Sequence, residues 1–270
     1  MIVVKVGGSL VHGGFLGGIL DDIARLSRSE GLVLVHGGGA VVTEVAEKLG
    51  VKQQFITSPT GIRSRYTDRE TAEVFAMVMA GKINTEIVAS LRARGVDAFG
   101  LSGVDGGLIV AERKKRLIVL DERGRKRAID GGYTGRIVQV RAEVLKALLG
   151  AGFTPVVSPV AIGIENEVLN VDADRAAAYV AMALGAERLV ILTNVPGLLD
   201  ERGELVRELT VEDARERMKR VGPGMDKKLL AATEALDGGV GEVLIADGRS
   251  GSPITGALGG APHTAIRRGS

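Results

Sequence analysis

Two glycine-rich segments near the start of the chain, Lys5–Gly8 and His36–Gly39, have residue types that suit phosphate binding. Each follows an apolar run typical of a β-strand and precedes a stretch with helical periodicity. The first amides of a helix lack partners within the helix and carry a partial positive charge, and glycine lets the backbone approach an anion closely. Because both turns end strands of one strand–helix–strand unit, we expect them to converge on a single phosphoryl group beside Lys5.

The lysine of the first segment is hard to explain by structure alone. Lys5 lies in the apolar run MIVVKV, where an unpaired buried ammonium would be costly, so the sequence favours a functional role for it. The chain has neither the GxxxxGK phosphate loop nor the GxGxxG dinucleotide motif. An esterase oxyanion loop would require a GxSxG nucleophile motif, which is also missing. The pattern therefore indicates a phosphate site of another kind.

The composition excludes several other classes of function. A net charge of +2 and 3% aromatic residues give no sign of nucleic-acid binding. Zero cysteines exclude disulfides and thiolate metal sites, and three scattered histidines argue against zinc. The chain opens directly on a strand, without a signal peptide, and no apolar run reaches the length of a membrane span. We therefore expect a cytoplasmic enzyme that binds neither nucleic acid nor membrane.

Apolar, β-branched runs alternate with stretches of helical period along most of the chain. This alternation predicts an α/β fold with a largely parallel open central sheet covered by helices on both faces. The predicted strands are Ile2–Val6, Leu32–His36, Ala98–Leu101, Thr154–Ser158, Leu189–Thr193 and Glu242–Ala246. The predicted helices are Gly18–Ser27, Ala40–Leu49, Asp68–Arg94 with a break near Gly81, Ala173–Leu184 and Met225–Leu236.

One region interrupts the alternation. Four short runs separated by charged turns predict a β-hairpin excursion: Leu108–Ala111, Leu117–Leu120, Ala128–Ile129 and Arg136–Val140. Residues 112–130 hold eight basic side chains against four acidic ones. Two interpretations stay open, a solvated hairpin with charged edges and a docking surface for an acidic protein. A nucleic-acid patch is less favoured because no aromatic residues lie between the charges.

Seven motifs in order along the chain resemble those of the amino acid kinase family. They are Lys5–Gly8, His36–Gly39, Gly61–Asp68, Gly100–Gly106, Asn170–Asp174, Thr193–Leu199 and Gly222–Lys228. The resemblance covers nearly the whole chain. It implies a three-layer α/β/α sandwich, with one kinase domain over residues 1–270. An acceptor-binding N-terminal lobe would span 1–165 and a nucleotide-binding C-terminal lobe 166–270.

Within this family the chain is most similar to the acetylglutamate kinase branch, and especially to archaeal kinases acting on a carrier-linked substrate. Arg65–Asp68, Ala111–Arg116 and Gly131–Gly135 carry that similarity. It implies ATP-dependent phosphorylation of the side-chain carboxylate of 2-aminoadipate or glutamate held on a small acidic amino-group carrier protein. The product would be an acyl phosphate in lysine or arginine biosynthesis, and the enzyme a homodimer. The alternatives are an N-acetylglutamate kinase acting on the free molecule and a nucleotide-binding sensor.

The resemblance also implies roles for individual residues. Lys5, Asp174 and Lys228 match catalytic positions, with Asp174 held between the two lysines. Substrate binding falls on Gly38, Gly39, Asn170 and one of Arg63 and Arg65, of which Arg65 is preferred because the following Tyr-Thr-Asp anchors the alignment. ATP binding falls on Lys5, Gly7, Gly8, Thr193, Asn194, Gly197, Leu198, Gly224, Met225 and Lys228.

Three further expectations follow from the chemistry of a carboxylate acceptor. Such a group is already ionised at neutral pH, so no general base is needed. The sequence offers no obvious protein carboxylate pair for a metal, so Mg²⁺ is expected to ride on the ATP phosphates. Glutamate and aminoadipate differ by one methylene, worth only about 0.8 kcal/mol when buried, so the acceptor length stays open.

Two other side chains are expected to have structural roles. His36 is expected to satisfy a backbone group at its strand end, and Lys227 to be solvated.

Overall fold

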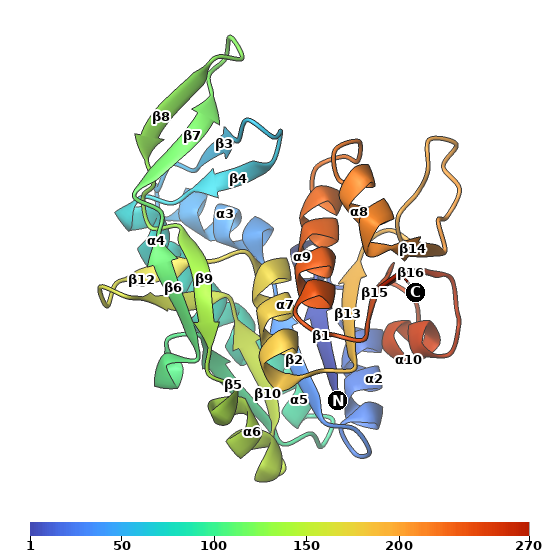
Figure 1. The fold of residues 1–270 in the computed structure, drawn as a ribbon. Helices are drawn as coiled ribbons and strands as arrows, with labels where there is room; N and C mark the ends of the chain where they lie inside the picture. Colours follow the sequence, from blue (N-terminus) through green and yellow to red (C-terminus); the bar gives the residue numbers. More distant parts are fainter. Residues whose placement is uncertain (270) are drawn as a thin grey trace.

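The computed structural model describes residues 1–269, and its centre is an eight-stranded sheet (Figure 1). All neighbouring strands in this sheet pair in parallel except β15 and β16. The strand order is β14 (Glu208–Thr210), β16 (His263–Arg267), β15 (Glu242–Asp247), β13 (Arg188–Thr193), β1 (Ile2–Val6), β2 (Leu32–His36), β10 (Thr154–Ser158) and β5 (Ala98–Ser102). The six predicted strands all belong to it.

Helices cover both faces of the sheet and confirm the predicted three layers. The α-helices are α1 (Gly8–His12), α2 (Gly17–Leu26), α3 (Gly39–Lys48), α4 (Arg69–Ala76), α5 (Asn84–Arg92), α6 (Ala142–Gly150), α7 (Ala173–Leu184), α8 (Val211–Arg217), α9 (Met225–Asp237) and α10 (Pro253–Leu258). A single turn of 3₁₀-helix lies at Asp105–Gly107. Because strand side chains alternate, Ile2, Val4 and Val6 pack among α2, α4, α5 and α10, whereas Val3 faces the side of α7 and α9. Lys5 shares the face of Val3.

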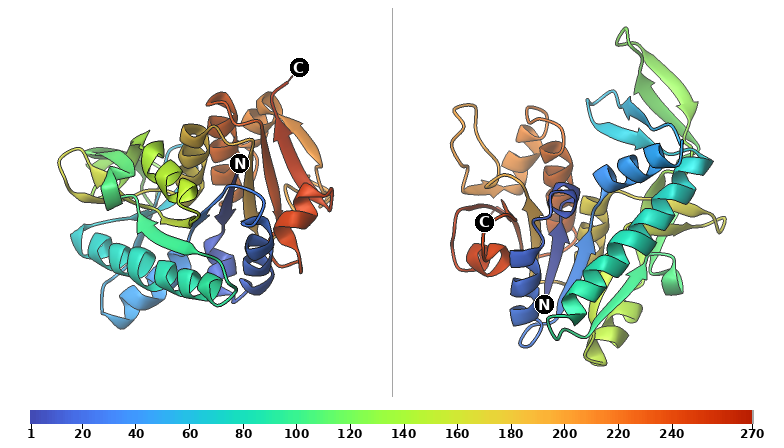
Figure 2. Two further views of the ribbon diagram at one scale, coloured as in Figure 1. Left: turned by 90° about the horizontal axis from the view of Figure 1, so that it is seen from below. Right: turned by 180° about the vertical axis from the view of Figure 1, so that it is seen from behind.

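The longest predicted helix is continuous rather than broken near Gly81. Between α4 and α5 lies a π-helical segment, η1 (Met77–Ile83), so the helix runs unbroken over Arg69–Arg92 and crosses the back of the molecule (Figure 2). By length and composition this helix could cross a membrane, so the expectation that no segment reaches that length was too strong. Its buried face packs on β5 and β10, which explains its apolar residues by core packing.

The predicted hairpin excursion divides into two parts. Strands β6 (Ile109–Arg113) and β9 (Gly135–Val140) pair with each other and join β11 (Val160–Gly163) and β12 (Val168–Asn170) in a second sheet. The segment between them forms a hairpin of β7 (Arg116–Leu120) and β8 (Lys126–Asp130) that projects from the body (Figure 1). A second hairpin, β3 (Gln54–Thr57) with β4 (Arg63–Tyr66), was not predicted and lies against β7. We call these two the cleft hairpins.

Candidate active site

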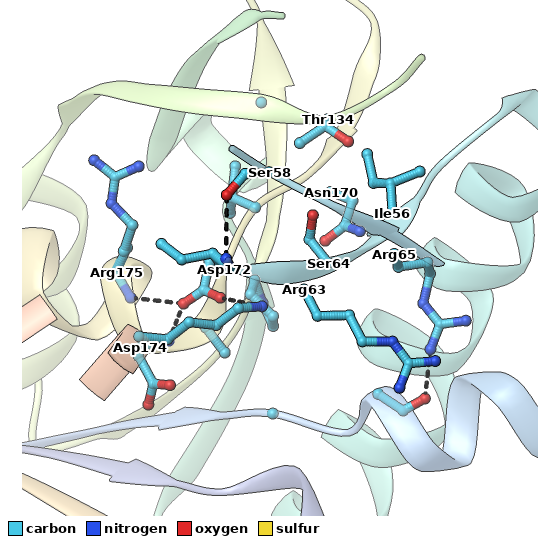
Figure 3. A pocket seen from close by; sticks show the side chains of 18 of the residues that line it. Ile56, Ser58, Arg63, Ser64, Arg65, Thr134, Asn170, Asp172, Asp174 and Arg175 are labelled. Carbon is cyan, nitrogen blue, oxygen red and sulfur yellow. Dashed lines mark hydrogen bonds and ion pairs between the residues drawn. The ribbon is translucent and has the colours of Figure 1, made fainter. Parts of the chain in front are cut away.

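A cleft of about 720 Å³ opens at the carboxyl ends of β1 and β2. Its walls come from the glycine turns after these strands, the cleft hairpins, and the N-terminal ends of α7 and α9. Arg63, Arg65 and Asn170 lie on one side of it, and Asp174 and Arg175 on the other (Figure 3). The cleft is therefore where an open α/β sheet is expected to bind its ligand.

Two lysines meet one aspartate at the floor of this cleft. The Nζ atom of Lys5 lies 2.7 Å from Oδ1 of Asp174, and Nζ of Lys228 lies 3.5 Å from Oδ2. Lys5 is 4% exposed and Asp174 6% exposed, so both charges are nearly removed from water. We call Lys5, Asp174 and Lys228 the lysine–aspartate centre. The three residues come from β1, α7 and α9, which are far apart in the sequence.

Local structure explains how these side chains reach one point. Strand alternation turns Lys5 toward α7, which packs on β1. The side chain of Asp172 caps α7 by accepting hydrogen bonds from the amides of Asp174 and Arg175, which fixes Asp174 in the first turn. Lys228 lies one turn into α9, and its Nζ also donates to the carbonyl of Gly224.

The charges in this centre set each other's ionisation. Burial by itself raises the pKa of the Asp174 carboxyl, but the ammonium groups of Lys5 and Lys228 outweigh it, so that pKa lies below its usual value. Burial and the nearby charge of Lys5 lower the pKa of Lys228, and Asp174 opposes them. Asp174 is therefore a carboxylate, and the centre has one excess positive charge when both lysines are protonated. That charge suits a polyphosphate.

The glycine turns supply amide donors next to this centre. A Cβ atom on Gly8 would lie 2.8 Å from the amide nitrogen of Gly38 and 3.1 Å from that of Gly39, so the backbones of the two turns are in direct contact. Within residues 1–269, neither the Gly38 nor the Gly39 amide donates a hydrogen bond to the protein. We call Gly8, Gly37, Gly38 and Gly39 the glycine cradle. All four line the cleft, as does Lys5.

The two candidate arginines differ in how they are held. Arg65 donates through Nη2 to the Gly39 carbonyl at 2.7 Å and to Thr43 at 2.9 Å, and also contacts Gln53. The side chain of Arg63 has no hydrogen bond or ion pair among the described residues, and its guanidinium carbon lies 4.8 Å from the centre of the Phe55 ring. Both line the cleft, so the structure leaves the preference for Arg65 a prediction. Asn170 also lines the cleft and donates to Thr67.

The predicted nucleotide residues lie in two groups. Gly8, Gly224 and Lys5 line the cleft. Lys228 is not part of the lining, but it contacts Asp174, which is. The amide of Gly7 donates to Leu192, and the amide of Leu198 donates to Thr264. The cleft lining does not include the following predicted residues, whose nucleotide roles stay predictions: Gly7, Thr193, Asn194, Gly197, Leu198 and Met225.

The cleft also contains two lysines that the sequence did not place in it. Lys227, expected to be solvated, lines the cleft and lies 3.4 Å from Asp172. Lys114 lines it too, and burial together with the charge of Arg175 lowers its pKa. Leu117–Val119 of β7 complete an apolar wall. One of these lysines lies near a polar helix start and the other in a charged hairpin. The sequence around them therefore does not indicate whether their side chains face the cleft or the solvent.

The basic segment is thus less uniform than its sequence indicated. Arg113 donates to the Gly132 carbonyl at 2.6 Å and stacks on Tyr133, so it holds the hairpin base. Lys115 pairs with Glu165 at 3.1 Å. The tip carries exposed Arg123, Lys126 and Arg127. Arg116, at the start of β7, is exposed as well.

Among the described residues, no group of three or more His, Cys, Asp or Glu side chains could hold a metal ion. The two carboxylates that line the cleft are already engaged, Asp174 by two lysines and Asp172 by Lys227 and the start of α7. The donor set therefore does not fit a metal held by protein carboxylates. It fits one held by the oxygens of a bound polyphosphate.

The fold and this site define a phosphotransferase class. The profile of the amino acid kinase family matches residues 1–247. The chain belongs to the amino acid kinase family. Among similar proteins, one from Nitrosopumilus maritimus is 53% identical over 258 residues, which cover 96% of each chain, and has the provisional name LysW-aminoadipate/LysW-glutamate kinase.

A protein of Saccharolobus islandicus with that same name is 47% identical over 259 residues, again 96% of each chain. Among solved structures, N-acetylglutamate synthase from Neisseria gonorrhoeae, complexed with coenzyme A and N-acetyl-glutamate, superposes with a TM-score of 0.82 and 25% identity. The match covers all of this chain and 59% of the synthase. These similarities confirm the family resemblance and the fold that the sequence indicated.

Proposed function

We propose that this protein transfers the γ-phosphoryl group of ATP to the side-chain carboxylate of 2-aminoadipate or glutamate bound to a small acidic carrier protein. The observation that carries the proposal is the lysine–aspartate centre beside the glycine cradle. Relatives at 47–53% identity over nearly the whole chain are named for this activity. The products are ADP and an acyl phosphate that feeds lysine or arginine biosynthesis.

In this reaction an acceptor carboxylate oxygen attacks the γ-phosphorus while the bond to the ADP oxygen breaks. The acceptor is already ionised, so no side chain has to remove a proton. Lys5 and the cradle amides would stabilise charge on the transferring group, and Lys228 would hold the ATP phosphates from the α9 side. Asp174 keeps the two ammonium groups apart and oriented.

We also propose that Mg²⁺ enters with ATP, held by phosphate oxygens and water. When bound it would neutralise phosphate charge. The N-terminal lobe, residues 1–165, would bind the acceptor, and residues 166–270 would bind the nucleotide through the predicted residues of β13, the loop after it, and α9. A cytoplasmic location follows because ATP and amino-acid precursors meet there, and the homodimer stays a prediction.

The cleft hairpins would receive the carrier-linked acceptor. Arg65, or Arg63 in its place, would bind the acceptor's free carboxylate through a bidentate guanidinium contact, with Asn170 and the cradle beside it. The apolar side chains of β7 face the same cleft and suit an aliphatic chain. The exposed basic tip lies beyond the cleft, where complementary charge would guide an acidic carrier.

One assay compares the candidate functions directly. Purified protein is given Mg-ATP with carrier-linked aminoadipate, carrier-linked glutamate or free N-acetylglutamate, and acyl phosphate is trapped with hydroxylamine. We expect turnover on one or both carrier-linked substrates and little on the free molecule. Preferred turnover of free N-acetylglutamate would support the alternative small-molecule kinase instead. Tight ATP binding without turnover of any of the three would indicate a nucleotide sensor.

A further inference from the structure

His36 is fully buried at the end of β2, directly before the glycine cradle. Its Nδ1 lies 3.1 Å from the carbonyl oxygen of Gly37. Its Nε2 lies 3.3 Å from Nδ2 of Asn84, which also donates to the carbonyl of Val156 at 2.9 Å. One ring nitrogen thus faces a hydrogen-bond acceptor, and the other faces a donor.

These partners allow only one protonation state of the ring. A carbonyl oxygen accepts only, so Nδ1 must carry the proton that it donates to Gly37. The Asn84 amide nitrogen already donates to Val156, so it faces Nε2 as a donor, and Nε2 must be an unprotonated acceptor. Burial, helped by the nearby charge of Lys5, lowers the pKa of His36 to about 4, although the bond to Gly37 opposes this shift. At neutral pH the ring is neutral with a fixed tautomer.

The bond to Gly37 determines where the next amide points. In a trans peptide unit the carbonyl of one residue and the N–H of the next point in opposite directions. With the Gly37 oxygen turned toward the buried ring, the N–H of Gly38 is turned away from it, toward the side where Gly8 and the cleft lie. The short approach between Gly8 and the Gly38 nitrogen agrees with this orientation.

The π-helical segment supports the arrangement from behind. A Cβ atom on Gly38 would lie 2.1 Å from Ile83 and 3.2 Å from the sulfur of Met79, so η1 packs directly on the cradle backbone. Asn84 follows η1 immediately and is 4% exposed. A π-helical turn shifts the residues after it around the helix axis relative to a regular α-helix, and such turns recur at functional sites. Here the shift applies to the residue that meets His36.

We propose that His36 and Asn84 are positioning residues, which hold the Gly37–Gly38 peptide unit so that the Gly38 amide is aimed at the transferring phosphoryl group. This inference rests on the proposed kinase function. Neither side chain touches the reacting atoms. Their contribution is to fix one backbone donor before the substrates bind, which avoids reorganisation during the reaction.

Two substitutions at His36 separate positioning from packing. In His36→Asn the amide nitrogen occupies the Nδ1 position and can still donate to Gly37, whereas in His36→Gln it occupies the Nε2 position and cannot. We expect His36→Gln to lower kcat about 10- to 100-fold with little change in the KM for ATP, a part of the loss caused by removing one oxyanion donor. His36→Asn should stay within about threefold of wild type.

A purely structural role predicts the opposite order. Asn is smaller than Gln and leaves the larger cavity, so it should lower the melting temperature more. If kcat follows the melting temperature in both variants, or if His36→Gln turns over like wild type, the proposal is wrong. If neither variant folds, the tautomer of the His36 ring in the unaltered protein tests the proposal instead.

The tautomer is measured on the unaltered protein by long-range ¹H–¹⁵N NMR of the imidazole rings, of which the chain has three. We expect a neutral ring protonated at Nδ1 for His36 at pH 7, and an Nδ1–H proton protected from exchange. A ring protonated at Nε2 would overturn the proposal. This measurement needs no turnover, so it stands even if the assays above show that the protein is not a carrier-dependent kinase.

Discussion

The lysine–aspartate centre and the β7–β8 hairpin face the same cleft but differ in nearly every physical property. The centre is buried, and each of its charges has a partner supplied by another element. The hairpin exposes Ile118 by 48% and carries its arginines and lysines in water. The charges of the centre hold one another in place, whereas those of the hairpin face solvent. Substitutions in the two regions should therefore fail in different ways.

The largest effect is expected from removing either lysine of the centre. Lys5→Ala and Lys228→Ala should each lower kcat by about 10²-fold or more, since each removes a preorganised charge from the phosphoryl site. Lys227→Ala is the matched control, because its side chain is adjacent in sequence but pairs with Asp172 instead. Steady-state kinetics measures all three. Near-wild-type kcat in Lys5→Ala would remove that residue from the mechanism.

The second prediction concerns the pH dependence of folding stability. The pKa of His36 is about 4 in the folded protein and about 6.5 when unfolded, so the unfolded chain binds more protons between these values. Stability is therefore complete above about pH 6.5 and falls as the pH drops toward 4, with His36 contributing a loss of about 2 kcal/mol between pH 7 and pH 5.

Urea unfolding at several pH values measures this loss. His36→Gln should flatten the dependence, because it removes the buried imidazole that causes it. An unchanged slope in His36→Gln would show that the ring is not buried in its neutral form.

The third prediction compares the two arginines of the β3–β4 hairpin. Arg65→Ala should raise the acceptor KM about tenfold, the loss of one charged hydrogen-bonded contact, and leave the KM for ATP unchanged. Arg63→Ala should do less. Because Arg65 also holds the Gly39 carbonyl, a fall in kcat alone would indicate that it positions the cradle. The reverse order of acceptor KM values would move carboxylate binding to Arg63.

The smallest effect is expected at the exposed tip of the β7–β8 hairpin. Reversing Arg123, Lys126 and Arg127 to Glu should lower kcat/KM for a carrier-linked substrate about fivefold, mainly through slower association. A small untethered analogue should be unaffected, because these residues lie outside the cleft lining. The wild-type rate should also fall with salt, since charges at such a rim are screened over about 8 Å. Equal loss on both substrates would make the hairpin a structural edge.

The same difference between regions explains what the sequence predicted. Ile2–Val6 and Leu32–His36 were located correctly because buried parallel strands are continuous apolar runs, and Lys5 was conspicuous within one of them. The β3–β4 hairpin was missed because Arg63–Arg65 are polar and line a cleft rather than a core. Lys114 and Lys227 were missed because only the tertiary structure turns them inward. The hydrophobic pattern of the long helix did not predict the π-helical segment Met77–Ile83.

The way the β7–β8 hairpin is attached has a consequence for the origin of new specificities. Its two ends meet at the base, where Gly131 donates to the Lys115 carbonyl and Lys114 to that of Thr134, and the β6–β9 ladder closes beneath them. Residues 115–131 therefore form a separate segment, because backbone hydrogen bonds at its base hold its two ends together. Two crossovers at this base would therefore replace the segment proposed to meet the carrier protein and leave the lysine–aspartate centre unchanged, and the same two junctions are available for grafting in the laboratory.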